Sequence, residues 1–137
     1  MNVPVTSIDD LLLTADRLIA GHRVRATPAG RHRGASLALR TALEIAVDRT
    51  LDAAVPGLAL TTTRAKMLCL RCYTATNTAR RANAVWSQLC LGCHYHHYEI
   101  GPTYDQVRTW RAEVGELVEV LISDCLFTLT NCTPYAP

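Results

Sequence analysis

The sequence predicts an all-α protein: one helical bundle of about five helices over residues 1–137, with an irregular C-terminal tail. Two observations lead to this prediction. Ala and Leu are abundant, whereas aromatic residues make up only 6% of the chain, a composition that favours helices. Apolar residues also recur at helical spacing in five segments, and the connections between them suit antiparallel neighbours.

The five segments are bounded by residues that commonly cap helices. Ser7, Ser36 and Thr103 each precede a periodic apolar run and are suitable N-caps, and Gly21 follows the first run, where a helix would end. The second segment has the widest apolar face, so we expect it to be the central helix. The expected helices cover residues 8–20, 36–55, 61–73, 78–93 and 104–123.

Two stretches are expected to lack regular structure. Residues 21–35 contain a proline, several glycines and many basic residues, which predicts a basic loop. Residues 124–137 contain Cys125, Phe127 and Cys132 and end in Pro-Tyr-Ala-Pro, which predicts an irregular C-terminal arm with loose last residues.

Positive charge is unevenly distributed, although the net charge is only +2. Residues 17–43 contain six Arg and no acid, and residues 53–98 contain four Arg, one Lys and three His, again without an acid. Such stretches favour phosphate-bearing partners, either nucleic acid or a nucleotide. The alternative is that Arg-rich, Lys-poor usage reflects a GC-rich genome. The candidate phosphate-binding residues are Arg23, Arg25, Arg31, Arg33, Arg64, Lys66, Arg71, Arg80, Arg81 and His96.

Four cysteines in the middle of the chain have two interpretations. Cys69 and Cys72 form one Cys-x-x-Cys pair, and Cys90 and Cys93 form another, at a spacing that four-thiolate zinc sites use. In two antiparallel helices that turn near Thr76, however, the nearest cysteines of the two pairs are offset by roughly 15 Å. Zinc holds sulfur at about 2.3 Å, so the two interpretations exclude each other. We expect structural cysteines on apolar faces and no cofactor; a zinc-stabilised module is the alternative.

Three histidines, His94, His96 and His97, follow the fourth predicted helix. A His can give or take a proton near neutral pH and an Arg can hold a phosphate bidentately, which together suffice for metal-free RNA cleavage. His94 and His97 are the candidate catalytic residues. Because Arg80 lies about 20 Å along its own helix from His94, an Arg of a neighbouring helix or second subunit would have to complete the site. The alternative is that these histidines cap the helix or are solvated.

The first residues of the chain do not resemble a signal peptide. They lack a basic start and reach Asp9 and Asp10 before any apolar run, and no apolar stretch is long enough to span a bilayer. We therefore expect a cytoplasmic protein without a membrane partner, whose six cysteines are reduced or metal-bound.

The order of segments resembles that of small all-helical proteins of the HEPN type found in actinobacteria. The resemblance is carried, within residues 36–120, by LALRTALEIAVDRTLDAAVPGL, TRAKMLCLRCY and ARRANAVWSQLCLGCHYHHYEIGPTYDQVRTW. It implies a helical bundle, often dimeric, that binds nucleotides or RNA; active members cleave RNA with an Arg and a His four to six residues apart. Residues 87–92, where that Arg would fall, are Ser, Gln, Leu, Cys, Leu and Gly, so the motif is broken.

The sequence therefore predicts a homodimeric accessory or regulatory protein that binds a nucleotide or nucleic acid through its Arg residues and its His loop. It contains no Gly-rich phosphate loop, Ser-His-Asp order or catalytic carboxylate pair, so any enzymatic activity would be metal-independent RNA cleavage. Glu113, Glu116 and Glu119 are interpreted as a solvated helix face. A helical protein-interaction subunit with an acidic partner is a further alternative.

Overall fold

All regular structure in the described part of the chain is helical. The computed structural model describes residues 7–94 and 100–131, with side chains up to residue 127. The predicted all-α class is confirmed. The helices are α1 (Ile8–Ala20), α2 (Pro28–Ala54), α3 (Thr63–Cys69), α4 (Thr76–Cys93) and α5 (Tyr104–Asn131), with short 3₁₀ turns η1 (Leu58–Leu60) and η2 (Leu70–Cys72).

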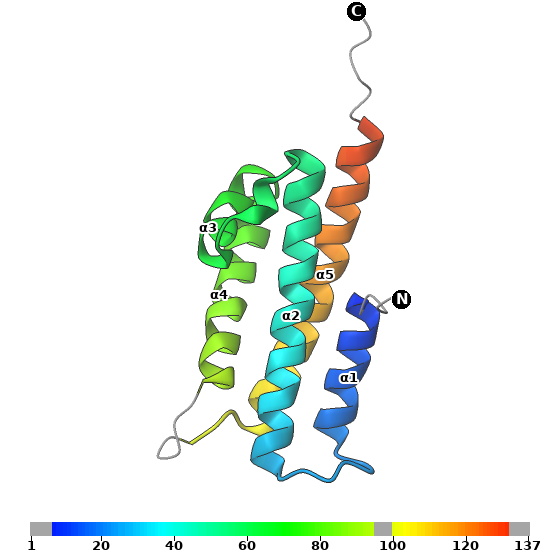
Figure 1. Ribbon diagram of the computed structural model, residues 1–137, viewed down its shortest axis with the longest axis vertical. Helices are drawn as coiled ribbons and strands as arrows, with labels where there is room; N and C mark the ends of the chain where they lie inside the picture. Colours follow the sequence, from blue (N-terminus) through cyan, green and yellow to red (C-terminus); the bar gives the residue numbers. More distant parts are fainter. Residues whose placement is uncertain (1–6, 95–99, 132–137) are drawn as a thin grey trace, which may run out of the picture.

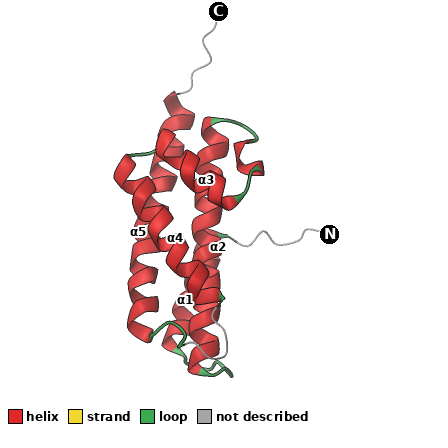
Figure 2. Cartoon of the chain, turned by 90° about the vertical axis from the view of Figure 1, so that its left-hand side faces the viewer, coloured by secondary structure: helices red, strands yellow, loops and turns green. Residues whose placement is uncertain are grey.

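Helix α2 is the centre of the bundle, as the sequence predicts. It packs against α1, α4 and α5, and α5 also contacts α1 and α4. The chain runs down α1, up α2, down α4 and up α5, while α3 lies against one end of α2 and α4 (Figure 1, Figure 2). We call the end with the α1–α2 and α4–α5 connections the lower end, and the end with α3 the upper end. The two ends carry different sets of basic residues, described below.

One hydrophobic core joins the four long helices. Its fully buried members include Leu39, Leu43 and Leu51 from α2, Leu89 from α4 and Leu117 from α5. In the described part of the chain, no helix is long and apolar enough to cross a membrane.

Two predicted helix starts are confirmed by their caps. The Ser7 hydroxyl accepts a hydrogen bond from the Asp10 backbone N–H at 3.0 Å, and the Asp10 carboxylate accepts one from the Ser7 N–H at 3.2 Å, so α1 begins with a capping box. Hydrogen bonding of the Asp10 carboxyl to the side chain and backbone of Ser7 lowers the pKa of that carboxyl. Thr103 similarly precedes α5, where its hydroxyl accepts from the Gln106 N–H at 3.2 Å.

The predicted basic loop over residues 21–35 is wrong for its second half. Helix α2 begins at Pro28, with Thr27 as N-cap accepting from the Gly30 N–H at 3.1 Å, so Arg31 and Arg33 lie on a helix. The proline is the cause: at the first helical position its lack of an N–H costs nothing and its φ already suits a helix. Ser36 is not a cap but a buried residue inside α2, whose hydroxyl donates to the His32 carbonyl at 2.8 Å.

The predicted irregular arm over residues 124–137 is also wrong where the structure describes it. Helix α5 continues to Asn131, and residues 132–137 lie outside the described part. No glycine or proline occurs between Gly115 and Pro134, so nothing in the sequence stops the helix earlier. The predicted third helix, residues 61–73, is instead α3 followed by the tighter turn η2.

Candidate phosphate-binding site

The predicted phosphate-binding residues lie at both ends of the bundle and not on one face. The 18 residues of α4 span about 27 Å, which separates the two ends. The upper-end residues are Arg64 and Lys66 on α3, Arg71 in η2, and Arg80 and Arg81 in the first turns of α4. The lower-end residues are Arg23 and Arg25 on the α1–α2 connection and Arg31 and Arg33 on α2.

Two upper-end cations are held by carboxylates of the same chain. Lys66 Nζ lies 2.7 Å from Asp48 Oδ1. Arg81 contacts Glu113 at 2.7 Å and Glu116 at 2.8 Å. The hydrogen bond that Arg81 donates to Glu113 raises the pKa of the Arg81 guanidinium and lowers the pKa of the Glu113 carboxyl. Glu116 and Glu119 are exposed, as the interpretation of a solvated helix face expects, but Glu113 and Glu116 also form ion pairs with Arg81.

The lower end contains a basic hollow between α2 and the end of α4, which we call the arginine hollow. Its volume is about 320 Å³, and its lining includes Arg33, Arg40 and His94, together with Gly30, Gly34, Leu37 and Cys93. No carboxylate is among these lining residues, which all belong to the described part of the chain. Arg33 and Arg40 are seven residues apart on α2, two helical turns, so their side chains lie on the same side of the helix.

Arg40 supplies the neighbouring-helix arginine that His94 was expected to need. Arg40 Nη1 lies 3.4 Å from His94 Nε2, and Arg40 Nε lies 3.6 Å from a carboxylate oxygen of Glu44. Glu44 also accepts a hydrogen bond from Trp86 Nε1 at 2.9 Å, which holds it in place. Sequence reasoning missed Arg40 because it treated α2 as starting at Ser36; a start at Pro28 makes the spacing to Arg33 visible.

The four central cysteines do not come together. In the part of the chain that the structure describes, no three His, Cys, Asp or Glu side chains are placed to hold a metal ion. Cys90 lies fourteen residues into α4, about 21 Å from the helix start that Cys72 precedes. Cys93 is buried, as expected, but Cys72 is exposed and contributes nothing to the core. Burial raises the pKa of the Cys90 and Cys93 thiols, which opposes the thiolate form that zinc requires.

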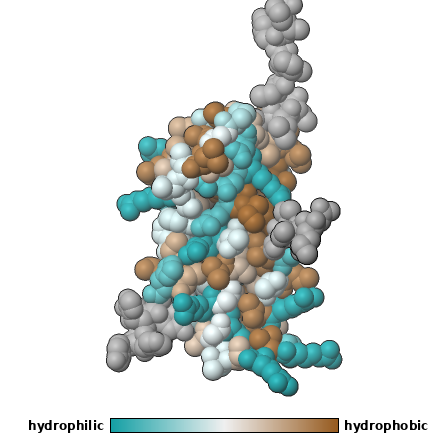
Figure 3. Space-filling model, in the orientation of Figure 1, coloured by the Kyte–Doolittle hydropathy of each residue, from teal (hydrophilic) through white to brown (hydrophobic). Residues whose placement is uncertain are grey.

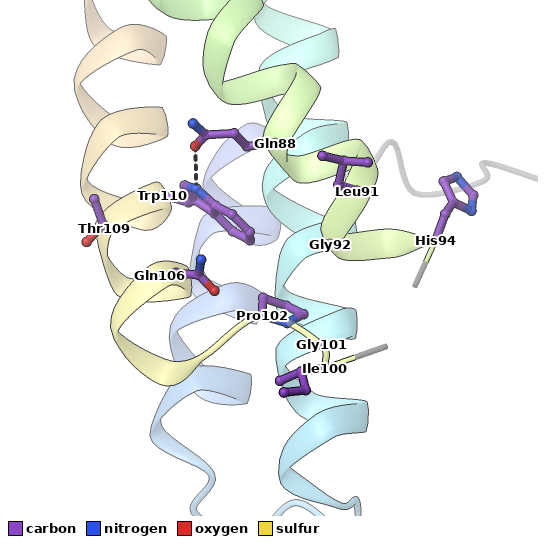
Figure 4. A pocket seen from close by; sticks show the side chains of 10 residues that line it. All are labelled: Gln88, Leu91, Gly92, His94, Ile100, Gly101, Pro102, Gln106, Thr109 and Trp110. Atoms are coloured by element: carbon purple, nitrogen blue, oxygen red, sulfur yellow. Dashed lines mark hydrogen bonds between the residues drawn. The ribbon is translucent and has the colours of Figure 1, made fainter. Parts of the chain in front are cut away.

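A second, larger hollow lies beside the first, between α4, α5 and the connection before α5 (Figure 4). We call it the tryptophan hollow. Its volume is about 590 Å³, and it is lined by Gln88, Leu91, Gly92, His94, Ile100, Gly101, Pro102, Gln106, Thr109 and Trp110. His94 lines both hollows. Sequence reasoning placed Trp110 on the apolar side of the fifth helix and therefore missed this site.

Three further candidates have different outcomes. His96 and His97 lie outside the described residues. Arg31 lies against the α1 terminus, because its guanidinium occupies the space where a Cβ on Gly21 would stand. Arg23 and Arg25 are exposed, and hydrophilic side chains project around the α1–α2 connection in Figure 3.

In comparisons with known proteins, no family model, no curated protein and no solved structure matches the chain. The resemblance to HEPN-type proteins therefore stays a prediction from the sequence pattern, and the case for function depends on the geometry of the two hollows.

Proposed function

We propose that this protein binds a phosphate-bearing ligand, a nucleotide or nucleic acid, at its lower end and acts as an accessory or regulatory protein. The observation that supports this most directly is the arginine hollow, where Arg33, Arg40 and His94 line one space and none of its described lining residues is a carboxylate. Guanidinium groups bind phosphate oxygens through paired, charge-assisted hydrogen bonds, so this lining suits a phosphate.

The surroundings of the arginine hollow add long-range attraction. Residues 17–43 contribute six positive charges and no negative one. Two nearby carboxylates are already engaged: Glu44 with Arg40 and Trp86, and Asp16 with Arg111 at 2.7 Å. A polyanion approaching the lower end therefore meets an excess of positive charge, which speeds association at low ionic strength.

The test is binding of a fluorescently labelled single-stranded RNA or DNA, measured by anisotropy at several salt concentrations. Arg33→Ala combined with Arg25→Ala should weaken binding about tenfold or more and lower the salt dependence by about one unit per lost phosphate contact. The matched control is Arg64→Ala with Arg71→Ala at the upper end, which removes the same charge and should leave binding nearly unchanged.

Equal losses in the two double variants would show that only net charge matters and would refute a site at the lower end. Binding to an acidic protein but to no nucleic acid or nucleotide would favour the protein-interaction alternative instead.

A second candidate function, metal-independent RNA cleavage, is supported by the 3.4 Å contact between Arg40 and His94. In this mechanism Arg40 turns to the scissile phosphate, which frees His94 Nε2 to take the proton of the 2′-hydroxyl. The 2′-oxygen then attacks phosphorus, and the 5′-oxygen of the next nucleotide leaves with a proton from water. The products are a 2′,3′-cyclic phosphate and a 5′-hydroxyl end.

Cleavage of RNA in the presence of a chelator, with the 2′-deoxy strand as the control, tests this second candidate. His94→Ala should abolish cleavage while binding persists. Cleavage at an unchanged rate in His94→Ala would remove His94 from the mechanism.

A further inference from the structure

The tryptophan hollow differs in chemistry from the arginine hollow beside it. Among the residues that the structure describes, its lining contains no Arg, Lys or carboxylate, and His94 is the one ionisable group there. Its volume of about 590 Å³ is in the range of pockets that bind small organic molecules. It is therefore suited to a neutral, partly apolar group, whereas its neighbour suits an anion.

The Trp110 ring forms a fixed wall of this hollow. A Cβ on residue 92 would lie 3.1 Å from the Trp110 ring, so the ring packs directly on the α4 backbone at Gly92. Trp110 Nε1 also donates a hydrogen bond to Gln88 Oε1 at 2.7 Å. These two contacts hold the indole plane in position, as a surface on which a flat ligand can stack.

Two glutamine amides flank the Trp110 ring, as Figure 4 shows. Gln88 Oε1 accepts from Trp110, and Gln106 Oε1 accepts from the Thr103 backbone N–H at 2.9 Å. With each carbonyl oxygen engaged, each amide can offer its NH₂ donors to acceptors on a ligand. Rings that carry carbonyl and imino nitrogen acceptors match such donors.

The rim of the tryptophan hollow is apolar and exposed. Leu91 is 75% exposed and Ile100 is 97% exposed, and both line the hollow. A flat ligand seated on Trp110 would cover part of this surface and gain from removing it from water.

We propose that the tryptophan hollow binds the base of a nucleotide whose phosphate lies in the arginine hollow. This inference rests on the proposed function, because it takes the phosphate position from it. His94 stands on the wall common to both hollows, so one ligand with a neutral aromatic ring and an adjoining anion can occupy the two together. A base must be unpaired and unstacked to enter, so the ligand is a free nucleotide or a single strand, not a duplex.

Tryptophan fluorescence tests the proposal, because the chain has two tryptophans and only Trp110 lines this hollow. Trp86→Phe removes the hydrogen bond to Glu44, so its strand affinity is first compared with that of the parent; its remaining emission comes from Trp110, and a single-stranded hexanucleotide should quench it. In Trp110→Phe the emission comes from Trp86, and the same strand should bind more weakly and with little quenching. A mononucleotide panel and a duplex of equal sequence complete the series, since the duplex should not quench Trp110.

A second measurement does not depend on substituting a core aromatic residue. An abasic hexamer carries the same phosphates without bases, and its binding to the unmodified protein should be about fivefold to a hundredfold weaker than that of the normal strand. Quenching by mononucleotides as well as by the strand would identify a free nucleotide as a sufficient ligand; quenching by the strand alone would identify nucleic acid.

The two proposals fail in different ways. If the normal and abasic strands bind equally, or the strand binds without quenching Trp110, the base site is refuted while phosphate binding stands. If neither strands nor mononucleotides bind at all, both proposals are overturned.

Discussion

Replacing Gly21 by Ala should destabilise the lower end for two separable reasons. Gly21 ends α1 with φ of 73°, and its N–H donates to the Arg17 carbonyl at 3.0 Å. An L-residue in that left-handed conformation costs about 1–2 kcal/mol. The new methyl group would also stand 1.6 Å from Arg31 Nη1, so the guanidinium must move, at a further cost of about 0.5 kcal/mol for a partly exposed side chain.

Gly57 provides the matched control for this prediction. Its φ is 88°, also left-handed, but nothing lies within 4 Å of a Cβ placed there. Gly57→Ala therefore carries the backbone cost alone, and the difference between the two variants isolates the displacement of Arg31. The double variant Gly21→Ala with Arg31→Ala has no guanidinium to displace. It should therefore recover the part of the lost stability that the displacement of Arg31 causes.

Thermal unfolding followed by circular dichroism measures these differences. For 137 residues, the unfolding entropy is about 0.29 kcal/mol per kelvin, so a loss of 1–2 kcal/mol lowers Tm by about 3–7 °C. If both alanine variants melt within 1 °C of the parent, the argument from positive φ is wrong. If Gly21→Ala and Gly57→Ala melt together, the guanidinium of Arg31 does not lie over Gly21.

Three further predictions concern other parts of the bundle. Arg81 lowers the pKa of Glu113 below its ordinary 4.5. This pair therefore stabilises the fold above about pH 4.5 and loses that contribution as the pH falls through the lowered pKa. In urea titrations, Glu113→Gln should lose less stability between pH 6 and pH 3 than the parent. Leu89→Ala should cost about 2–5 kcal/mol because Leu89 is fully buried, whereas the exposed Leu91→Ala should change unfolding by less than about 0.5 kcal/mol, measured the same way. The resemblance to HEPN-type proteins predicts a homodimer, and we expect the 71% exposed Phe127 to contribute to its interface. Light scattering should therefore show a dimeric parent and a monomeric Phe127→Asp; a monomeric parent would contradict the prediction.

Local signals decide how much of the fold follows from the sequence. Helix caps and apolar periodicity depend only on residues close together in the chain. The caps at Ser7 and Thr103 predict the starts of α1 and α5, and the apolar periodicity predicts the presence of α2 and α4. The start of α2 is harder to predict, because glycine and proline are typical of loops, although a proline directly after a threonine also marks a helix start. The end of α5 is also hard to predict, because its last residues are β-prone although none of them breaks a helix.

The candidate site could be predicted only in part, because its residues come from separate helices. The sequence indicates that His94 needs an arginine, but only tertiary packing brings Arg40 to it from 54 positions away. The helical periodicity of α5 predicts that Trp110 is a core residue. Trp110 can line the tryptophan hollow because its ring packs against Gly92 of α4, a contact that the sequence does not indicate. By contrast, the distance between the two cysteine pairs follows from the rise of a single helix, so sequence reasoning could separate them.

The close approach of α2 and α4 has a consequence for the thermodynamics of binding. A Cβ on Gly92 would lie 3.1 Å from Ser36 Oγ, and Ser36 stands midway between Arg33 and Arg40 on α2. The backbones that carry the cations and His94 are thus held together by contact at their centre and not by a loop. These backbones are already in position before a ligand binds, so binding costs little main-chain conformational entropy. The main cost of binding is the desolvation and ordering of two arginine side chains.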